Sequence, residues 1–291
     1  MPVLENDALK ITVADRGAEP VSVWDKENGC ERLWTAEPAV WNRHAPILFP
    51  FVGRVTEGKY RVGGKEFSMP TQHGFARDMR FACTEEAPDR ITHRLAACAE
   101  TLKEYPFDFA LTVQHRLCTG KARQLEIRWT VENRGSETMF YAIGGHPGFL
   151  MPKGTAKEDC FLLFPGQETL QYISANAAGF ALPEEKHSLP LEDGFIQYRD
   201  DIPDTWIFED GQVPCVGIAG PDRKPYVVLH CAQFPMLAVW AAQNGPFICL
   251  EPWFGRTDDE GFTGSIDRKK DIRMLPAGGK EQFAYQIDFL S

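Results

Sequence analysis

The stretch Gln124-Leu125-Glu126-Ile127-Arg128-Trp129-Thr130-Val131 decides the fold class of this chain. Polar and apolar residues alternate along it, and this period of two is typical of a β-strand with one face buried and the other in water. Phe283-Ala284-Tyr285-Gln286-Ile287-Asp288-Phe289 repeats the pattern near the C-terminus. Shorter runs predict further strands at residues 10–13, 21–24, 110–113, 226–229 and 237–240.

Turn residues, apolar spacing and local composition predict the remaining elements. Residues 60–67 predict a hairpin, because the Gly63-Gly64 pair supplies the positive φ that a two-residue turn needs. No segment keeps a helical apolar spacing for three turns, and residues 174–204, rich in Glu, Asp, Pro and Gly, predict a long excursion over the surface. We therefore expect an all-β fold with few short helices, formed by residues 1–291 as a single large antiparallel β-sandwich domain.

Composition limits the classes of partner. The 291 residues carry a net charge of −10 with a pI near 5.3, which argues against nucleic acid, since phosphate binding needs a basic face. No apolar stretch approaches the roughly 20 residues of a membrane helix. The N-terminal residues contain no basic segment followed by an apolar run, so we expect no signal peptide.

The eight cysteines are scattered singly, without a C-x-x-C pair, and several lie in apolar runs, as Cys160 does before Phe161. This pattern is typical of buried free thiols in a reducing cytoplasm. Zinc binding and disulfides are the alternatives. The motifs of phosphate loops, dinucleotide-binding folds, H-E-x-x-H zinc proteases and G-x-S-x-G hydrolases are absent, which counts against those chemistries.

Two stretches carry candidates for proton transfer. Gly144-Gly145-His146-Pro147-Gly148-Phe149 follows a strand-like run, and its glycines and proline predict a stiff turn that presents the His146 ring. Phe247-Ile248-Cys249-Leu250-Glu251-Pro252-Trp253 ends an apolar run with a carboxylate, and buried carboxylates are often poised for proton transfer. The Trp253 ring would suit the C–H face of a sugar. The alternative is that Glu251 pairs with an arginine such as Arg256.

Four further residues are candidates for ligand contacts. Arg54 ends an apolar run and is either an arginine fork for ligand oxygens or a surface residue that closes a strand. His73 either contacts a polar ligand or caps a backbone carbonyl. Arg77 would hold a substrate anion, or pair with Asp78 or another carboxylate. Asp204, taken alone, is an ordinary turn aspartate.

Together these motifs resemble the aldose 1-epimerase (galactose mutarotase-like) family over nearly the whole chain, and most closely its LacX-like branch. The motifs, in order, are F-P-x-x-G-R ending at Arg54, Q-H-G-F-A-R around His73, G-H-P-G-F around His146, D-T-W-I-F from Asp204 and L-E-P-W around Glu251. Each alone is a weak signal, but all of them in the expected order are a strong one. The resemblance implies a large antiparallel β-supersandwich.

The resemblance also implies roles. Glu251 would be the general base that takes the proton of the anomeric hydroxyl, and His146 the general acid that protonates the ring oxygen. His73, Arg54 and Asp204 would hold sugar hydroxyls. No metal or organic cofactor is expected, and the protein would be a cytoplasmic monomer or homodimer that acts on a small-molecule sugar.

The Q-H-G-F-A-R wording also occurs in hexose-6-phosphate 1-epimerases, in which Arg54 and Arg77 would take the phosphate. A non-catalytic sugar-binding protein on the same fold is a further alternative.

Overall fold

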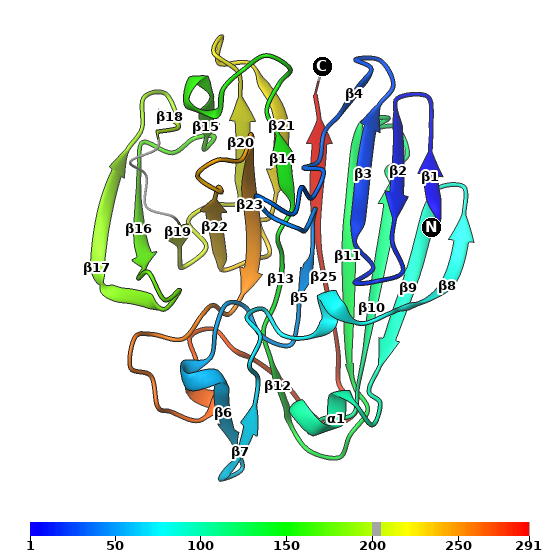
Figure 1. Cartoon of the computed structure of the whole chain (residues 1–291), viewed down its shortest axis with the longest axis vertical. Helices are drawn as coiled ribbons and strands as arrows, with labels where there is room; N and C mark the ends of the chain where they lie inside the picture. The colour runs from blue at the N-terminus through cyan, green and yellow to red at the C-terminus, as the bar shows by residue number, and fades with distance from the viewer. Residues whose placement is uncertain (200–204, 291) are drawn as a thin grey trace.

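The computed structural model describes residues 1–199 and 205–290, and the described chain is nearly all β (Figure 1). Two large antiparallel sheets dominate it, which confirms the expected sandwich. The nine-stranded sheet has the order β18-β15-β20-β21-β25-β11-β10-β9-β8. Its strands are β8 (Ala82–Ala87), β9 (Arg90–Ala96), β10 (Phe109–Leu117), β11 (Gln124–Asn133), β15 (Phe161–Leu163), β18 (Phe195–Gln197), β20 (Cys215–Ala219), β21 (Pro225–His230) and β25 (Lys280–Phe289).

The eight-stranded sheet runs β17-β16-β19-β22-β23-β13-β5, with β14 also paired to β23. Its strands are β5 (Ile47–Leu48), β13 (Ile143–Gly145), β14 (Gly148–Leu150), β16 (Thr169–Ala175), β17 (Ala181–Pro190), β19 (Thr205–Phe208), β22 (Met236–Trp240) and β23 (Phe247–Phe254). β23 is buried at every position, because one face meets the core between the sheets and the other is covered by loops.

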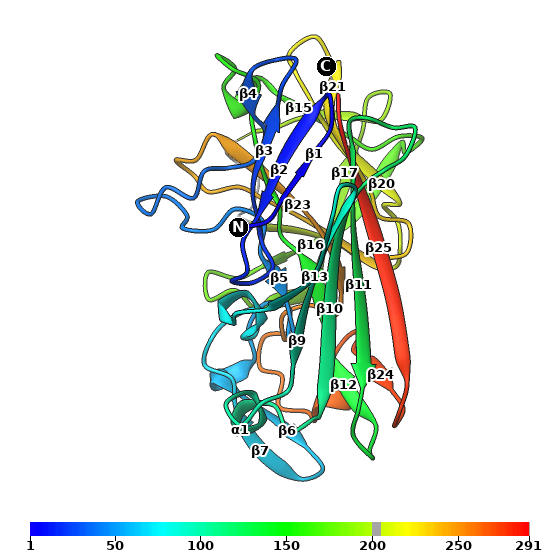
Figure 2. The ribbon, with the colours of Figure 1, turned by 90° about the vertical axis from the view of Figure 1, so that its right-hand side faces the viewer.

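Smaller elements complete the described chain. A four-stranded sheet lies against β9 and β10 through β1, and Figure 2 shows it beside the long strands of the nine-stranded sheet. It contains β1 (Val3–Glu5), β2 (Leu9–Val13), β3 (Pro20–Asp25) and β4 (Cys30–Glu31). The two-stranded sheets are β6 (Lys59–Val62) with β7 (Lys65–Ser68), and β12 (Met139–Tyr141) with β24 (Arg273–Leu275). The helical turns are α1 (Thr101–Glu104), η1 (Thr56–Gly58), η2 (Ala76–Asp78), η3 (Lys157–Asp159) and η4 (Ile266–Arg268).

The alternating stretches form the strands expected of them. The most alternating stretch lies in β11, near the centre of the nine-stranded sheet, and the C-terminal stretch in its neighbour β25. The hairpin is also confirmed, since Gly63 and Gly64 both have positive φ between β6 and β7. None of the helices in the described part of the chain is long and apolar enough to cross a membrane. The single domain over residues 1–291 stays a prediction, although one cluster of buried side chains takes residues from both large sheets.

Two expectations about the strands were wrong. The polar face of β11 is not wet throughout: Glu126 is only 3% exposed, because Arg116 and Arg128 of the same sheet cover it with ion pairs at 3.4 and 3.0 Å. The described part of residues 174–204, which ends at residue 199, lies largely at the surface but is not an irregular excursion, since it contains β17 and β18. β17 is an edge strand whose middle is exposed on both faces, so charged residues fill it and no apolar alternation marks it.

A buried ion-pair cluster ties the four-stranded sheet to the C-terminal strand. Asp25 of β3 is fully buried and accepts hydrogen bonds from Arg32 and Arg123. Both arginines also reach the end of the chain, where Arg123 donates to the carbonyl of Phe289 and Arg32 to that of Leu290. Burial alone would raise the pKa of Asp25, but hydrogen bonds from Asn28 and the two arginines lower it to about 2.

We expect Asp25→Ala to lower the free energy of unfolding by at least about 3 kcal/mol at pH 7, because it leaves two buried guanidinium groups without their carboxylate. Since the folded-state pKa is depressed, this stabilisation is present above about pH 4 and is lost as the pH falls through about 2. Urea denaturation at several pH values measures it. Asp222→Ala, at an exposed pair with Lys224, is the control and should change little. Equal stability of the two variants would contradict a structural role for Asp25.

Candidate functional site

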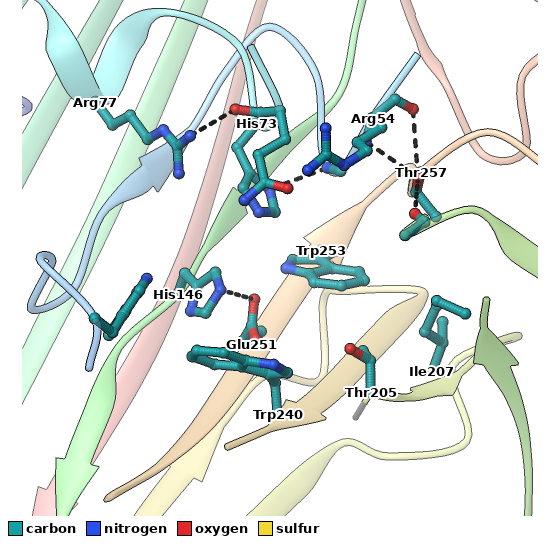
Figure 3. A pocket seen from close by; sticks show the side chains of 15 residues that line it. Arg54, His73, Arg77, His146, Thr205, Ile207, Trp240, Glu251, Trp253 and Thr257 are labelled. Carbon is teal, nitrogen blue, oxygen red and sulfur yellow. Dashed lines mark hydrogen bonds and ion pairs between the residues drawn. The ribbon is translucent and has the colours of Figure 1, made fainter. Parts of the chain in front are cut away.

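A cavity of about 220 Å³ opens on the face of the eight-stranded sheet that points away from the nine-stranded sheet (Figure 3). Alternation along β23 separates the two faces, because Ile248 and Leu250 join the main core whereas Glu251 and Trp253 line the cavity. Strands supply the floor, and the loops after β4, β5, β7, β16 and β23 supply the walls. The lining residues are Trp41, Gly53, Arg54, Gln72, His73, Arg77, His146, Ala175, Gly179, Thr205, Ile207, Trp240, Glu251, Trp253 and Thr257.

Strand register brings His146 and Glu251 together. β13 pairs with β23 through Gly144 opposite Trp253, and β14 pairs with it through Gly148 opposite Cys249. The register is the same on both sides of the break between these short strands, so His146 lies opposite Glu251. The His146 Nε2 atom is 3.3 Å from Glu251 Oε2, and Figure 3 shows the two side chains pointing toward each other.

The glycines before His146 do not form the expected turn. Gly144 and Gly145 belong to β13, and the chain continues almost directly into β14. Glycine is required at position 144 for a packing reason: a Cβ there would lie 2.4 Å from Cδ1 of Trp253. The missing side chain therefore lets the Trp253 ring lie over the strand and face the cavity.

Burial controls the protonation of the pair. His146 is 7% exposed and Glu251 1% exposed. Burial, aided by the charge of Arg77, lowers the pKa of His146 to about 3. Burial also raises the pKa of Glu251 well above its usual value, although the nearby Trp253 indole opposes this shift. Burial of the pair therefore favours a neutral imidazole and a carboxylic acid, which together hold one proton that can move between them.

Glu251 does not form the alternative pair with Arg256. That guanidinium instead donates to Glu209 at 2.8 Å and also pairs with Asp259. Apart from its 3.3 Å contact with His146 Nε2, Glu251 Oε2 has no hydrogen-bond partner in the described chain, and neither does the Trp253 Nε1 atom. A buried carboxylate oxygen and an indole N–H thus both remain available to a ligand.

His73 is fixed as a hydrogen-bond donor. Its Nδ1 atom accepts a hydrogen bond from the backbone N–H of Gly53 at 3.0 Å, so the ring proton resides on Nε2. Burial, followed by the charges of His146 and neighbouring arginines, keeps its pKa well below the usual value. The residue has a φ of 67°, an uncommon conformation held by the backbone hydrogen bond from His73 N–H to the Gly53 carbonyl.

Arg54 lies at the rim of the cavity and is largely exposed. Its backbone N–H donates to the Thr257 hydroxyl at 3.0 Å, and that hydroxyl donates to the Gly179 carbonyl at 2.7 Å. Gly53 allows this approach, because it has a φ of 69° and a Cβ there would lie 2.3 Å from that of Thr257. One threonine therefore joins three loops around the opening.

Arg77 is a more enclosed cation in the cavity wall, with its side chain 12% exposed. It donates to the Gln72 carbonyl at 2.8 Å, and its Nε atom forms no hydrogen bond with the described residues. The expected pair with Asp78 is loose at 3.9 Å, because Asp78 is bound more closely by Arg43 at 2.7 Å. Burial and the charge of Arg43 lower the pKa of Arg77 to about 10.

Three tryptophans surround the proton-transfer pair. Trp240 and Trp253 lie on either side of Glu251 in Figure 3, and Trp41 packs against the His146 ring with centroids 4.8 Å apart. Trp41 was not expected, since it comes from a loop without a sequence pattern. Thr257 and Trp240 were also missed as cavity residues, although the strand ending at Trp240 was predicted.

Asp204 lies outside the described residues, and its neighbour Thr205 lines the cavity. The eight cysteines are free thiols, but only Cys160, Cys231 and Cys249 are buried, so the expectation of general burial was wrong. In the described chain, one group of side chains has the composition of a metal site, namely His146, Cys249 and Glu251, with ligand atoms within 4.8 Å of one another.

Comparisons with known proteins show the family to which the chain belongs. A family model described as aldose 1-epimerase matches residues 2–187. The chain is 30% identical over 99% of both lengths to the chromosomal Protein LacX of Lactococcus lactis subsp. lactis. A galactose mutarotase related enzyme from Lactobacillus acidophilus superimposes with a TM-score of 0.93 at 31% identity, covering 99% of this chain and 97% of that one. A galactose mutarotase-like protein from Lactobacillus casei ATCC 334 gives 0.89 at 31% identity over 99% of each chain.

The burial of Glu251 predicts a gain in stability when its charge is removed. The unfolded chain ionises Glu251 at the usual pKa of 4.5, whereas the folded chain ionises it only at a raised pKa. The carboxyl group therefore lowers the free energy of unfolding as the pH rises above 4.5, and the loss is complete once the pH has passed the folded-state pKa. We expect Glu251→Gln to raise the free energy of unfolding by about 1–3 kcal/mol at pH 8 and to have little effect at pH 4. Urea denaturation at both pH values measures this difference, with the exposed Glu168→Gln as control. A less stable Glu251→Gln protein at pH 8 would contradict it.

Proposed function

Since the chain belongs to the aldose 1-epimerase family, we propose that it interconverts the α and β anomers of a hexose by acid–base ring opening and reclosure. One observation carries this proposal: His146 Nε2 and Glu251 Oε2 face each other at 3.3 Å beside a cavity walled by indole rings. At about 220 Å³ the cavity is smaller than the ~300–1,000 Å³ of pockets for drug-sized ligands, which suits a single sugar ring.

The reaction begins with the shared proton on His146. Glu251 takes the proton of the anomeric hydroxyl while His146 donates its proton to the ring oxygen. The bond from C1 to the ring oxygen breaks, and C1 becomes an aldehyde. After rotation of the aldehyde, the ring hydroxyl attacks its other face, His146 takes the proton back, and Glu251 returns its proton to the former aldehyde oxygen. The opposite anomer leaves, and both groups are restored.

Burial supports the ring-opening step. Opening converts an imidazolium and a carboxylate into a neutral imidazole and a carboxylic acid, which are the forms that the low exposure of both groups favours. Burial of His146 and Glu251 thus lowers the free energy of the ring-opened state relative to that of the closed state. On reclosure the neutral imidazole can accept the proton of the ring hydroxyl and the carboxylic acid can return its own, so the two groups exchange roles.

The surrounding residues would orient the sugar. His73 has its Nε2–H available to donate to a hydroxyl oxygen, and Arg54 offers a guanidinium at the rim. Trp253 presents an indole face for the C–H surface of the ring and an N–H without a protein partner. Asp204 is retained as a further hydroxyl ligand on the family resemblance, next to Thr205 in the cavity wall.

His146→Asn and Glu251→Gln should each lower the rate of anomer exchange by at least about 10²-fold, the usual scale for removing a general acid or base. Polarimetry on freshly dissolved α-D-glucose and α-D-galactose, or exchange NMR, measures the rate. His187→Asn, which alters an exposed ring stacked on Tyr172, is the matched control. If either variant of the pair works at nearly the wild-type rate, the assigned roles are wrong.

A hexose 6-phosphate is the second candidate substrate, and the environment of Arg77 favours it. The ion pair of this enclosed guanidinium with Asp78 is loose at 3.9 Å, because Arg43 holds that carboxylate more closely, at 2.7 Å. Arg54 adds a second cation at the same opening. Two arginines are well suited to a phosphate group, because the guanidinium fork matches its oxygens.

If the substrate is phosphorylated, the wild-type protein should exchange the anomers of glucose 6-phosphate much faster than those of glucose. Arg54→Ala or Arg77→Ala should then lower kcat/KM for the 6-phosphate by about 10–10²-fold, since a hydrogen bond to a charged group contributes ~1.5–3 kcal/mol. Arg61→Ala, outside the cavity, is the control. Faster exchange of the free sugar would exclude the phosphate.

A sugar-binding protein without turnover predicts a different result, namely thermal stabilisation by hexoses and no change in anomer exchange. The facing acid and base argue against it, because binding alone does not require that pair. We also propose a cytoplasmic location, which suits eight free thiols.

A further inference from the structure

Cys249 is a buried thiol that the proposed reaction does not use. It precedes Glu251 by two positions in β23, so both side chains leave the strand on the cavity face. Its side chain is fully buried and packs in the cluster of Trp34 and Phe247 next to Trp41, and Trp41 also covers the His146 ring. A sulfur atom therefore lies beside the proton-transfer pair, just below the floor of the cavity.

The three polar groups already lie at nearly the spacing of a metal site. Ligand atoms of His146, Cys249 and Glu251 are within 4.8 Å of one another, and His146 Nε2 is 3.3 Å from Glu251 Oε2. Bonds of ~2.0–2.3 Å to tetrahedral zinc place neighbouring ligand atoms about 3.3–3.7 Å apart. The imidazole and the carboxylate meet this spacing, and the sulfur would have to move by about 1 Å or less.

The cluster also contains unsatisfied polar atoms. Glu251 Oε2 and His146 Nδ1 are buried without a hydrogen-bond partner in the described chain, and both side chains are at least nine-tenths buried. Such atoms are uncommon in folded proteins and call for a ligand or a catalytic role. Sugar chemistry accounts for the carboxylate and the imidazole, but it does not account for a thiol on the same face.

We propose that His146, Cys249 and Glu251 form a binding site for a thiophilic divalent cation, Zn²⁺ in particular, at the floor of the cavity. The metal would take the place of the proton that His146 and Glu251 share. The thiol would lose its proton to solvent on binding, and thiolate and carboxylate together would neutralise the two charges of the cation. The fourth position faces the cavity, where a water molecule completes the tetrahedron.

The surroundings make this site selective. Arg77 lines the same cavity as His146 and Glu251, and its positive charge opposes any cation held by charge alone. Mg²⁺ and Ca²⁺ bind through several oxygen ligands, including water molecules. A set of one sulfur, one nitrogen and one carboxylate offers them too few oxygen atoms. Zn²⁺ and Co²⁺ form strong bonds to thiolate and imidazole, so these ions can overcome the unfavourable charge.

Occupation of the site would stop the proposed reaction. A metal bound to His146 and Glu251 removes the lone pairs that must accept and return protons, so turnover falls while the fold remains. This inhibitory consequence rests on the proposed epimerase function, whereas the binding of the metal does not.

The test uses the full-length protein after treatment with a chelator. CoCl₂ should produce a near-ultraviolet absorption band from thiolate-to-cobalt charge transfer, at one ion per chain, and ZnCl₂ should abolish that band by displacement. Cys249→Ala should lose the band and bind Co²⁺ at least ~10²-fold more weakly, since even outer partners of metal ligands contribute 10–100-fold in affinity. MgCl₂ should have no effect.

Cys215→Ala is the matched control, because Cys215 also lies beside a histidine, with its sulfur 3.6 Å from His230 Nδ1 on the nine-stranded sheet. It should keep the band. A wild-type protein without the band, or a band that survives in Cys249→Ala and disappears in Cys215→Ala, would overturn the proposal. If Cys249→Ala does not fold, Cys249→Val fills the space of the thiol and gives the same comparison.

Anomer exchange provides the second measurement. ZnCl₂ should inhibit the wild-type and Cys215→Ala proteins, and Cys249→Ala should stay active at the same zinc concentration. Exchange that is absent without metal would disprove the epimerase function but leave the cobalt spectrum to decide the site. Exchange that resists zinc while the cobalt band is present would disprove the inhibitory consequence alone.

Discussion

The register between β23 and the two short strands β13 and β14 is the constraint on which the site depends. It sets His146 opposite Glu251, and it sets Gly144 opposite Trp253, where only a glycine leaves room for the indole. Because side chains alternate along a strand, a slip of one residue would turn Glu251 into the core and Leu250 into the cavity. The apolar residues on the core face of β23 hold the register, so the same packing that stabilises the sandwich aligns the acid and the base.

The depth of the site explains its chemistry. β23 is buried on both faces, and a carboxylate in such a strand is costly unless it is protonated or bound to a ligand. Glu251 is the one acidic residue of β23, and the rings of Trp240 and Trp253 lie on either side of it. Little of either side chain is exposed, and the two pKa values move in the directions that let one proton pass between imidazole and carboxylate through a sugar. At Glu251 the protein therefore has a lower free energy of unfolding than an apolar side chain would give, and it gains a group that can transfer protons.

The sequence predicts the strands better where one face is apolar than where a strand lies at an edge. Alternation found β11 and β25, because the sandwich buries one of their faces in the core. It could not find β17, whose charged middle is exposed on both sides. The glycines before His146 were misread as a turn because a glycine needed for a close approach to Trp253 cannot be distinguished, in a single sequence, from one needed for positive φ.

The candidate site could be predicted in part for a similar reason. His73, His146, Arg54, Arg77, Glu251 and Trp253 stand in short motifs, and the structure gathers them around one cavity. Trp41 and Thr257 come from loops whose paths depend on tertiary contacts, so no local pattern marks them. The net charge of the sequence also says little about the charge inside the cavity. The chain carries −10 overall, but charges beyond a Debye length of about 8–10 Å are largely screened, so a ligand inside the cavity meets chiefly the groups that line it, among them Arg54 and Arg77. The acidity of the whole chain therefore does not argue against an anionic sugar, and the choice between a free hexose and its phosphate depends on those two guanidinium groups.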